Sequence, residues 1–210
     1  MILFRTHRAR GFTIIELLVV IAIIILVAGL VVGLGGVATS TQRTKRAEAE
    51  RAKLVTLIDA YKSKLGLYPP DNAANPDRNT LLYELAGATR TDGAPYSPAN
   101  QGYLNKFQNV ASNDLFNAFG AKGLINALTP GTADDPIDLK HLLKNLKPDQ
   151  YASVAPGTIS LVVPVDGPNG KPNPWNYLTG PNAVHNPNSY DLWVDIIAGG
   201  KTNRIANWKE

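Results

Sequence analysis

A single acidic side chain lies within a long apolar segment near the amino terminus. Residues 10–17 read RGFTIIEL, and no side chain from residue 17 to residue 38 is charged. A charged side chain costs about 2–3 kcal/mol at the middle of a bilayer and less near either end of a span. Acids in such segments usually have a function and a partner. We therefore expect Glu16 to be a functional residue that has a partner.

The apolar segment has the length of a membrane span. Residues 17–38 would form a helix of about 33 Å at about 1.5 Å per residue, which matches a hydrocarbon layer of about 30 Å. We place a transmembrane helix at 12–38, after a basic leader at 1–11. The alternative is an ordinary signal peptide or signal anchor, whose cleavage site would follow the apolar segment. Ala38-Thr39-Ser40 is a weak site of that kind.

Residues 10–24, which read RGFTIIELLVVIAII, resemble the class III signal of type IV prepilins and type II secretion pseudopilins. The resemblance covers about 25 residues. It implies that a prepilin peptidase cuts between Gly11 and Phe12 and then methylates the new amino group of Phe12. It also implies that Glu16 is the filament-assembly acid, neutralised in a low-dielectric filament core by the amine of a neighbouring subunit.

Composition adds few constraints on function. The 210 residues contain no cysteine, which excludes disulfides and thiolate metal sites, and the net charge is +4. Without the three arginines of residues 1–11, the chain has 18 basic and 17 acidic residues, so its net charge after cleavage is +1. This charge gives no reason to expect nucleic-acid binding. Basic residues flank both ends of the apolar segment, so charge does not set its orientation. The resemblance implies a cytoplasmic amino terminus in the bacterial inner membrane and a periplasmic or extracellular head.

The elements that follow the apolar segment would form the head. Residues 39–66 continue the helix as an amphipathic half, whose apolar face consists of Leu54, Leu57, Ile58, Tyr61 and Leu65. Gly66 and the two prolines at 69–70 should end this helix. Residues 67–157 are expected to be an elaborated loop region with short helices, one capped by Asn79 or Thr80 and ending at Ala86, and another at 138–146. A third apolar stretch, at 115–128, is broken by two glycines.

Residues 158–210 read as short strands separated by turns. We expect strands at 158–165, 174–178, 190–197 and 204–208, with Tyr190, Leu192, Val194 and Ile196 on one face of the third. This segment contains, in order, Asp166-Gly167, Pro174-Trp175 and Tyr190-Asp191-Leu192-Trp193. The order of these motifs resembles that in the carboxy-terminal sheet of the major pseudopilin. The resemblance therefore implies an α+β, pilin-like fold in which a long helix packs on a small antiparallel sheet.

Metal or catalytic chemistry has little support in this sequence. Relatives often bind calcium in the last β loop, and Asp191 and Asp195 are the nearest acids here, but the loop after them contains a lysine and no acid. They are weak calcium candidates, and we expect no other cofactor. The acidic cluster at 134–138 is better explained as a helix cap. The three histidines form no catalytic motif, so we expect no enzyme. Sheet-core anchoring is the favoured use of the three tryptophans, at positions 175, 193 and 208, over ligand binding.

The favoured function is that of a structural filament subunit, a pseudopilin-like protein of a type II secretion system. The partners implied by the resemblance are prepilin peptidase, further copies of the chain, minor pseudopilins, an inner-membrane assembly platform and membrane lipid. Two alternatives remain open. One is a type IV pilus pilin for adhesion, motility or DNA uptake, and the other is a membrane-anchored binding module that is never cleaved.

Overall fold

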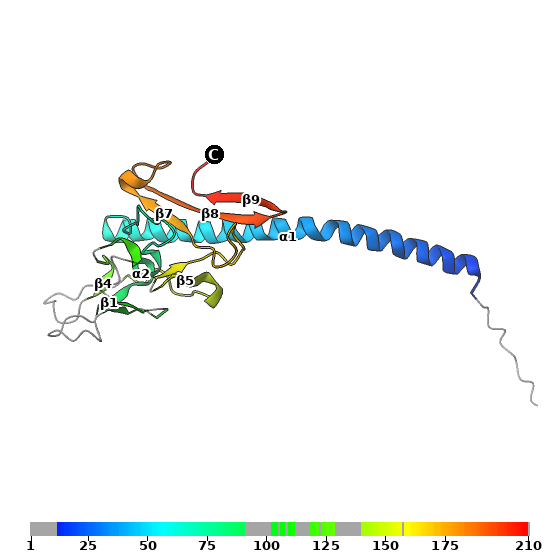
Figure 1. The fold of residues 1–210 in the computed structure, drawn as a ribbon, viewed down its shortest axis with the longest axis horizontal. Helices are drawn as coiled ribbons and strands as arrows, with labels where there is room; N and C mark the ends of the chain where they lie inside the picture. Colours follow the sequence, from blue (N-terminus) through cyan, green and yellow to red (C-terminus); the bar gives the residue numbers. More distant parts are fainter. Residues whose placement is uncertain are drawn as a thin grey trace, which may run out of the picture.

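The computed structural model describes residues 12–90, 102–104, 106–107, 109–111, 118–121, 123–128, 140–156 and 158–209. One long helix, α1 (Ile14–Leu65), projects from a head that is built on its second half (Figure 1). The head combines a short helix with small sheets, so the fold is α+β and pilin-like, as predicted. The leader at 1–11 and the acidic cluster at 134–138 lie outside the described residues.

Helix α1 is continuous over 52 residues, about 78 Å at about 1.5 Å per residue. It ends where predicted, because Gly66 takes a left-handed φ of 80° and its N–H bonds to the carbonyl of Lys62 at 2.9 Å. Across the part of the chain that is described, no helix combines the length and apolar character needed to cross a membrane. The side chains of 30–38, which belong to the predicted span at 12–38, lie outside the described set.

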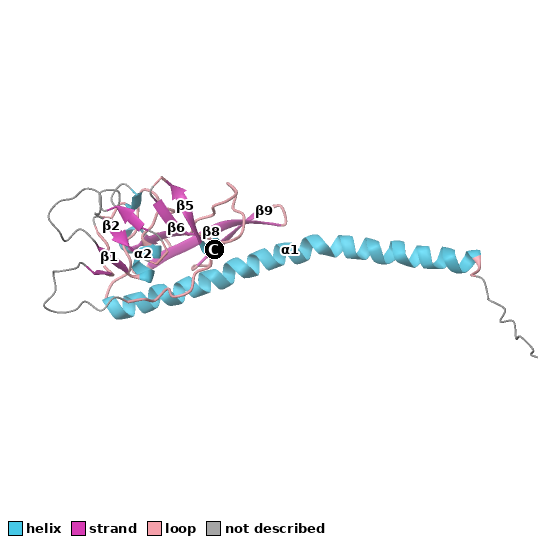
Figure 2. Ribbon diagram, turned by 90° about the horizontal axis from the view of Figure 1, so that it is seen from below, coloured by secondary structure: helices cyan, strands magenta, loops and turns pink. Residues whose placement is uncertain are grey.

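The carboxy-terminal sheet packs on one side of the second half of α1 (Figures 1 and 2). It has the order β7-β8-β9 and is antiparallel throughout, with β7 at Asn176–Thr179, β8 at Tyr190–Ala198 and β9 at Lys201–Ala206. A glycine turn at 199–200 joins the last two strands, so β9 begins three residues before the strand predicted at 204–208. The alternation predicted for β8 is confirmed, since Tyr190, Leu192, Val194 and Ile196 are all buried. A 3-10 turn, η2 (Gly180–Asn182), follows β7.

The rest of the head contains elements that were not all expected. Helix α2 (Leu81–Ala86) begins after Thr80, as predicted, although Thr80 makes no side-chain cap bond. A second sheet has the order β3-β2-β1-β4, with β1 at Ala88–Arg90, β2 at Gly102–Leu104, β3 at Asn109–Ala111 and β4 at Ala127–Leu128. A hairpin of β5 (Tyr151–Ala155) and β6 (Thr158–Leu161) follows the 3-10 turn η1 (Pro148–Gln150). None of β1 to β5 was predicted.

The helix predicted at 138–146 is wrong over its described part, because residues 140–147 form no helix. Their backbone groups bond to other elements instead. The N–H groups of Leu142 and Leu143 both donate to the carbonyl of Leu85, at 3.0 and 2.8 Å, and the Asn126 side chain bonds both backbone groups of Lys140. The described leucines of this segment therefore lie in an irregular stretch that is bonded to the end of α2, and among the leucines at 142, 143 and 146 only Leu143 is fully buried.

One apolar core holds the layers together. It joins the face of α1 that carries Leu54, Ile58 and Tyr61 to both α2 and β8. Trp175, which is 1 % exposed, fills the space just before β7. The predicted apolar face of the helix is thus confirmed, with Leu57 and Leu65 at its partly buried margin.

Candidate functional site

The predicted functional residues at the start of α1 form a capping box. Thr13 is the N-cap residue, and its Oγ1 accepts a hydrogen bond from the Glu16 N–H at 3.3 Å. The Glu16 Oε2 accepts in return from the Thr13 backbone N–H and from the Thr13 hydroxyl, both at 2.8 Å. A negative side chain in the first helical turn is also favoured by the helix dipole. Glu16 therefore has hydrogen-bond partners within its own chain.

This second role of Glu16 was missed in the sequence interpretation. The signal was available, because a Thr followed three residues later by a Glu before an apolar run is the signature of a capping box. Phe12 directly precedes Thr13 and is 82 % exposed, so it is accessible on the outside of the helix end. Gly11, the residue predicted to lie before the cleaved bond, is outside the described residues.

The first half of α1 exposes apolar side chains on all sides. From residue 12 to residue 27, the large apolar residues keep between 46 % and 82 % of their surface accessible. Soluble monomers rarely leave so large an apolar surface uncovered, so lipid or other protein must cover it. The exposed set is Phe12, Ile14, Ile15, Leu17, Leu18, Val19, Val20, Ile21, Ile23, Ile24, Ile25, Leu26 and Val27.

Comparison with known protein families finds a motif in the segment that contains Glu16. A family model described as the prokaryotic N-terminal methylation motif matches residues 6–32. The chain carries this methylation motif. The motif spans the Gly11–Phe12 bond and Glu16, and it ends within the apolar segment. The resemblance to prepilins and pseudopilins that the sequence predicted is therefore confirmed.

A known protein that is similar to this chain also supports the resemblance to pseudopilins. The chain is 33 % identical over 100 residues to the type II secretion system core protein G of Dickeya chrysanthemi. The match includes 48 % of this chain and spans 61 % of the length of that relative. No solved structure matches the chain.

The two weak calcium candidates are engaged by protein groups. The Asp191 carboxylate, in a side chain only 2 % exposed, accepts from the backbone N–H groups of His185 and Asn186 at 2.8 and 2.9 Å, and from the Asn186 side chain at 3.0 Å. Asp195 forms a two-pronged pair with Arg204 at 2.8 and 2.9 Å. Among the described residues, no group of three or more His, Cys, Asp or Glu side chains is suited to a metal. The two acids fix a loop and a strand pair, and this donor arrangement does not fit calcium.

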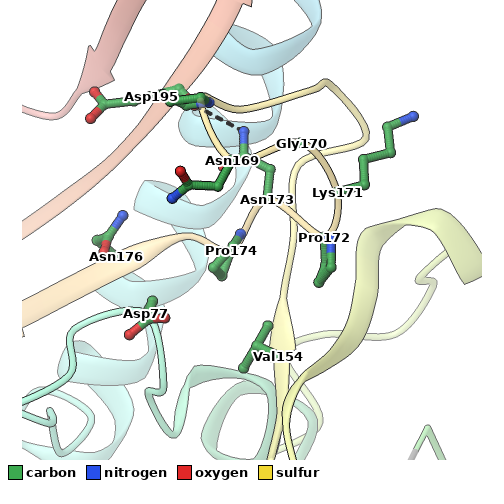
Figure 3. Close-up of a pocket in the computed structure, with 11 residues that line it drawn as sticks. Asp77, Val154, Asn169, Gly170, Lys171, Pro172, Asn173, Pro174, Asn176 and Asp195 are labelled. Atoms are coloured by element: carbon green, nitrogen blue, oxygen red, sulfur yellow. Dashed lines mark hydrogen bonds between the residues drawn. The ribbon is translucent and has the colours of Figure 1, made fainter.

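A polar pocket of about 360 Å³ lies between the 168–174 loop and the start of β7 (Figure 3). The Asn173 amide holds its wall by donating to the carbonyls of Val165 at 3.2 Å and Asp195 at 2.9 Å. Figure 3 shows the Asp195 carboxylate turned away from the pocket. No tryptophan lines it: Trp175 is buried, and the other two contact each other edge to face at 5.7 Å. The binding-module alternative assumed that the tryptophans bind a ligand. At this pocket they do not line the site.

A buried carboxylate that sequence reasoning did not single out joins the head to α1. Glu84, fully buried on α2, accepts from the Tyr61 hydroxyl of α1 at 2.7 Å and from the backbone N–H groups of Ile125 and Asn126 at 2.7 and 2.8 Å. Burial raises the pKa of Glu84 above its usual value, and the three hydrogen bonds partly oppose that shift. Burial, and then the nearby Glu84, also raise the pKa of Tyr61. The Tyr61–Glu84 pair therefore fastens α2 to the helix within the core.

Proposed function

We propose that this chain is a structural filament subunit, a pseudopilin-like protein of a type II secretion system, and not an enzyme. The observation that carries the proposal is the methylation motif at 6–32, joined without interruption to a 52-residue helix with an exposed apolar first half and a head on its second half. The name of the Dickeya relative favours type II secretion over a type IV pilus. The helices would form the filament core, with the heads outside.

In this proposal the chain waits in the inner membrane, with its amino terminus in the cytoplasm and its head in the periplasm. Prepilin peptidase cuts between Gly11 and Phe12 and methylates Phe12. The subunit then joins copies of itself and minor pseudopilins on the assembly platform. The exposed apolar side chains at 12–27 would be covered by lipid before assembly and by neighbouring helices afterwards.

The capping box gives Glu16 a defined state in the unassembled subunit. There the carboxylate is satisfied by Thr13 at 2.8 Å and helps to start α1. The proposed partner in the filament is the amine of Phe12 on a neighbouring subunit. A carboxylate has more than two acceptor sites, so it can accept from that amine and keep a bond to Thr13.

Two measurements test the proposal. The first is intact and amino-terminal mass spectrometry of the protein from its native membrane, where we expect a chain that begins at Phe12 and is one methyl group heavier than its sequence. A chain that keeps residues 1–11 while the peptidase is active would overturn the proposal and favour the uncleaved binding module. The second is Glu16→Ala, which should leave cleavage largely intact and impair polymerisation.

A further inference from the structure

A small cationic cavity lies where the head meets the first soluble turns of α1. It has a volume of about 220 Å³, and its charged lining consists of Arg43 and Arg46 from the helix and Asp166 and Lys171 from the loop before β7. Gln42 adds an amide to the rim. The cavity therefore contains three cations and one carboxylate.

The walls of this cavity are fixed by β8. The Ile197 N–H donates to the carbonyl of Asp166 at 2.8 Å, which holds the loop against the strand. Arg43 donates to the carbonyl of the same residue, Ile197, at 3.3 Å, which holds the helix side. Asp166 is thus held through its backbone, and Arg43 is held through its own guanidinium, although the Arg43 side chain remains 41 % exposed.

The cations are not fully neutralised by the acids around them. Asp166 is shared between Arg43 at 3.6 Å and Lys171 at 3.4 Å. Both distances exceed the roughly 2.7–2.9 Å of a close charge-assisted hydrogen bond. Arg46 has a close pair with Asp149 at 2.8 Å, and the side chains of Arg43 and Lys171 are 41 % and 63 % exposed. An incoming anion would therefore find two accessible cations that share a single carboxylate, which is the chemistry of a phosphate site.

The position of the cavity along the helix indicates which phosphate it would meet. Arg43 lies five residues beyond residue 38, the end of the predicted span, or about 7–8 Å farther along the axis. The headgroup layer of a bilayer adds about 5–7 Å on each side of the hydrocarbon. Arg43 would therefore lie at the outer edge of the headgroup layer, from where a long side chain that leans toward the amino-terminal end of the helix can reach the lipid phosphates. This step rests on the proposed membrane anchoring of the subunit.

We propose that this cavity binds the phosphodiester of an anionic phospholipid. Arg43 and Lys171 hold the phosphate oxygens, Gln42 donates to the headgroup, and the acyl chains lie beside the apolar half of α1. The bound lipid sets the height of the head above the membrane before assembly. Entry into a filament then exchanges this contact for contacts with neighbouring subunits.

The test uses the full chain in detergent micelles and native mass spectrometry. Phosphatidylglycerol is the probe, and diacylglycerol, which lacks the phosphate, is the matched neutral lipid. We expect one retained phosphatidylglycerol and no retained diacylglycerol. The double variant Arg43→Gln with Lys171→Gln should bind phosphatidylglycerol about thirtyfold more weakly, since each cation near a membrane surface contributes roughly a fivefold gain. The control variant Lys53→Gln with Lys209→Gln removes two exposed cations elsewhere and should bind like the parent.

Three results would overturn the inference. One is equal lipid retention by the two double variants, because the contact would then be general charge attraction. Another is displacement of the lipid by equimolar inorganic phosphate, which would make this a site for free anions. The last is a chain that begins at Phe12 and stays in the membrane after carbonate extraction, yet retains no lipid. This result would support the proposed subunit function and contradict the lipid site. A chain released by carbonate would instead count against the proposed function itself.

Discussion

Replacing Glu16 with glutamine should separate its two roles. The final position of a capping box accepts Glu or Gln, so Glu16→Gln keeps the bonds to Thr13 and removes the charge. Thr13→Val does the opposite, because it removes the capping hydroxyl and leaves the carboxylate in place. Glu48→Gln is the matched control, since it removes one charge from the same helix at a surface pair with Lys45.

The two roles differ in expected size. Loss of an N-cap side chain costs about 0.5–2 kcal/mol, which is at most about a 30-fold change in an equilibrium. Loss of one member of a buried ion pair costs about 3–5 kcal/mol, because the other charge is left buried without a partner. In a filament core, Glu16→Gln would leave the amine of Phe12 unpaired. We therefore expect subunit addition to fall by about two to three and a half orders of magnitude for Glu16→Gln, and by at most about 30-fold for Thr13→Val.

The assay measures filaments from cells that have the complete secretion machinery. Sheared filaments are sedimented, quantified against membrane-held subunit, and counted by electron microscopy. Amino-terminal mass spectrometry of each variant checks that the leader has been removed, so that a processing defect is not mistaken for an assembly defect. Normal filaments from Glu16→Gln together with a severe loss from Thr13→Val would refute the charge-pairing argument, and the role of Glu16 would then be to start the helix.

Further predictions concern the head. Tyr61→Phe should lower the unfolding free energy of the head by about 1–3 kcal/mol, because it leaves the buried Glu84 carboxyl group without this donor. Denaturation of the full chain in detergent, followed by tryptophan fluorescence, measures this, and an unchanged midpoint would contradict it. The raised pKa of Glu84 means that the folded head holds this proton more tightly than the unfolded chain does. The protonated Glu84 therefore stabilises the fold fully below about pH 4.5, and this stabilisation is lost as the pH rises through the folded pKa. Glu84→Gln should flatten the dependence of the melting temperature on pH between about pH 4 and 8, and an equally steep profile in the variant would show that another group is responsible. Asp191→Ala should release the 183–189 loop, seen as faster proteolysis there at a nearly unchanged melting temperature. Adding calcium or a chelator should leave the melting temperature of the head unchanged, and a clear rise with calcium would show that the donors rearrange to hold it.

The parts of the fold that could be predicted are those specified by local chemistry. The end of α1 follows from Gly66, which can take a φ of 80°, and the β8–β9 turn follows from the two glycines at 199–200. The faces of β8 follow from strict alternation. Each of these signals lies within a few residues of the feature that it specifies, so no knowledge of distant contacts was needed.

The parts that could not be predicted depend on partners far away in the sequence. The 138–146 segment has helical leucine spacing, but Leu85, more than fifty residues earlier, takes the backbone bonds of Leu142 and Leu143. Strand β1 pairs with β4, and the two are separated by more than thirty residues. Glu84 stands in the apolar run LLYELA, where an acid is unusual, but its partners on α1 and at 125–126 are not visible in that run. The capping box at Thr13 was local and could have been found.

The alignment of β8 with α1 has a mechanical consequence. The Tyr190 hydroxyl donates to Asp59 at 3.3 Å at one end of the strand, and Arg43 donates to Ile197 at 3.3 Å at the other. From position 59 back to position 43 the helix covers about 24 Å, and from 190 to 197 an extended strand covers about the same length. The strand therefore runs antiparallel to the helix along its axis (Figure 1). An axial pull on α1 loads these fastenings together, in shear, whereas a sideways pull would break them one after another. A subunit drawn out of a membrane by its helix would thus carry its head along under the load direction that the joint resists best.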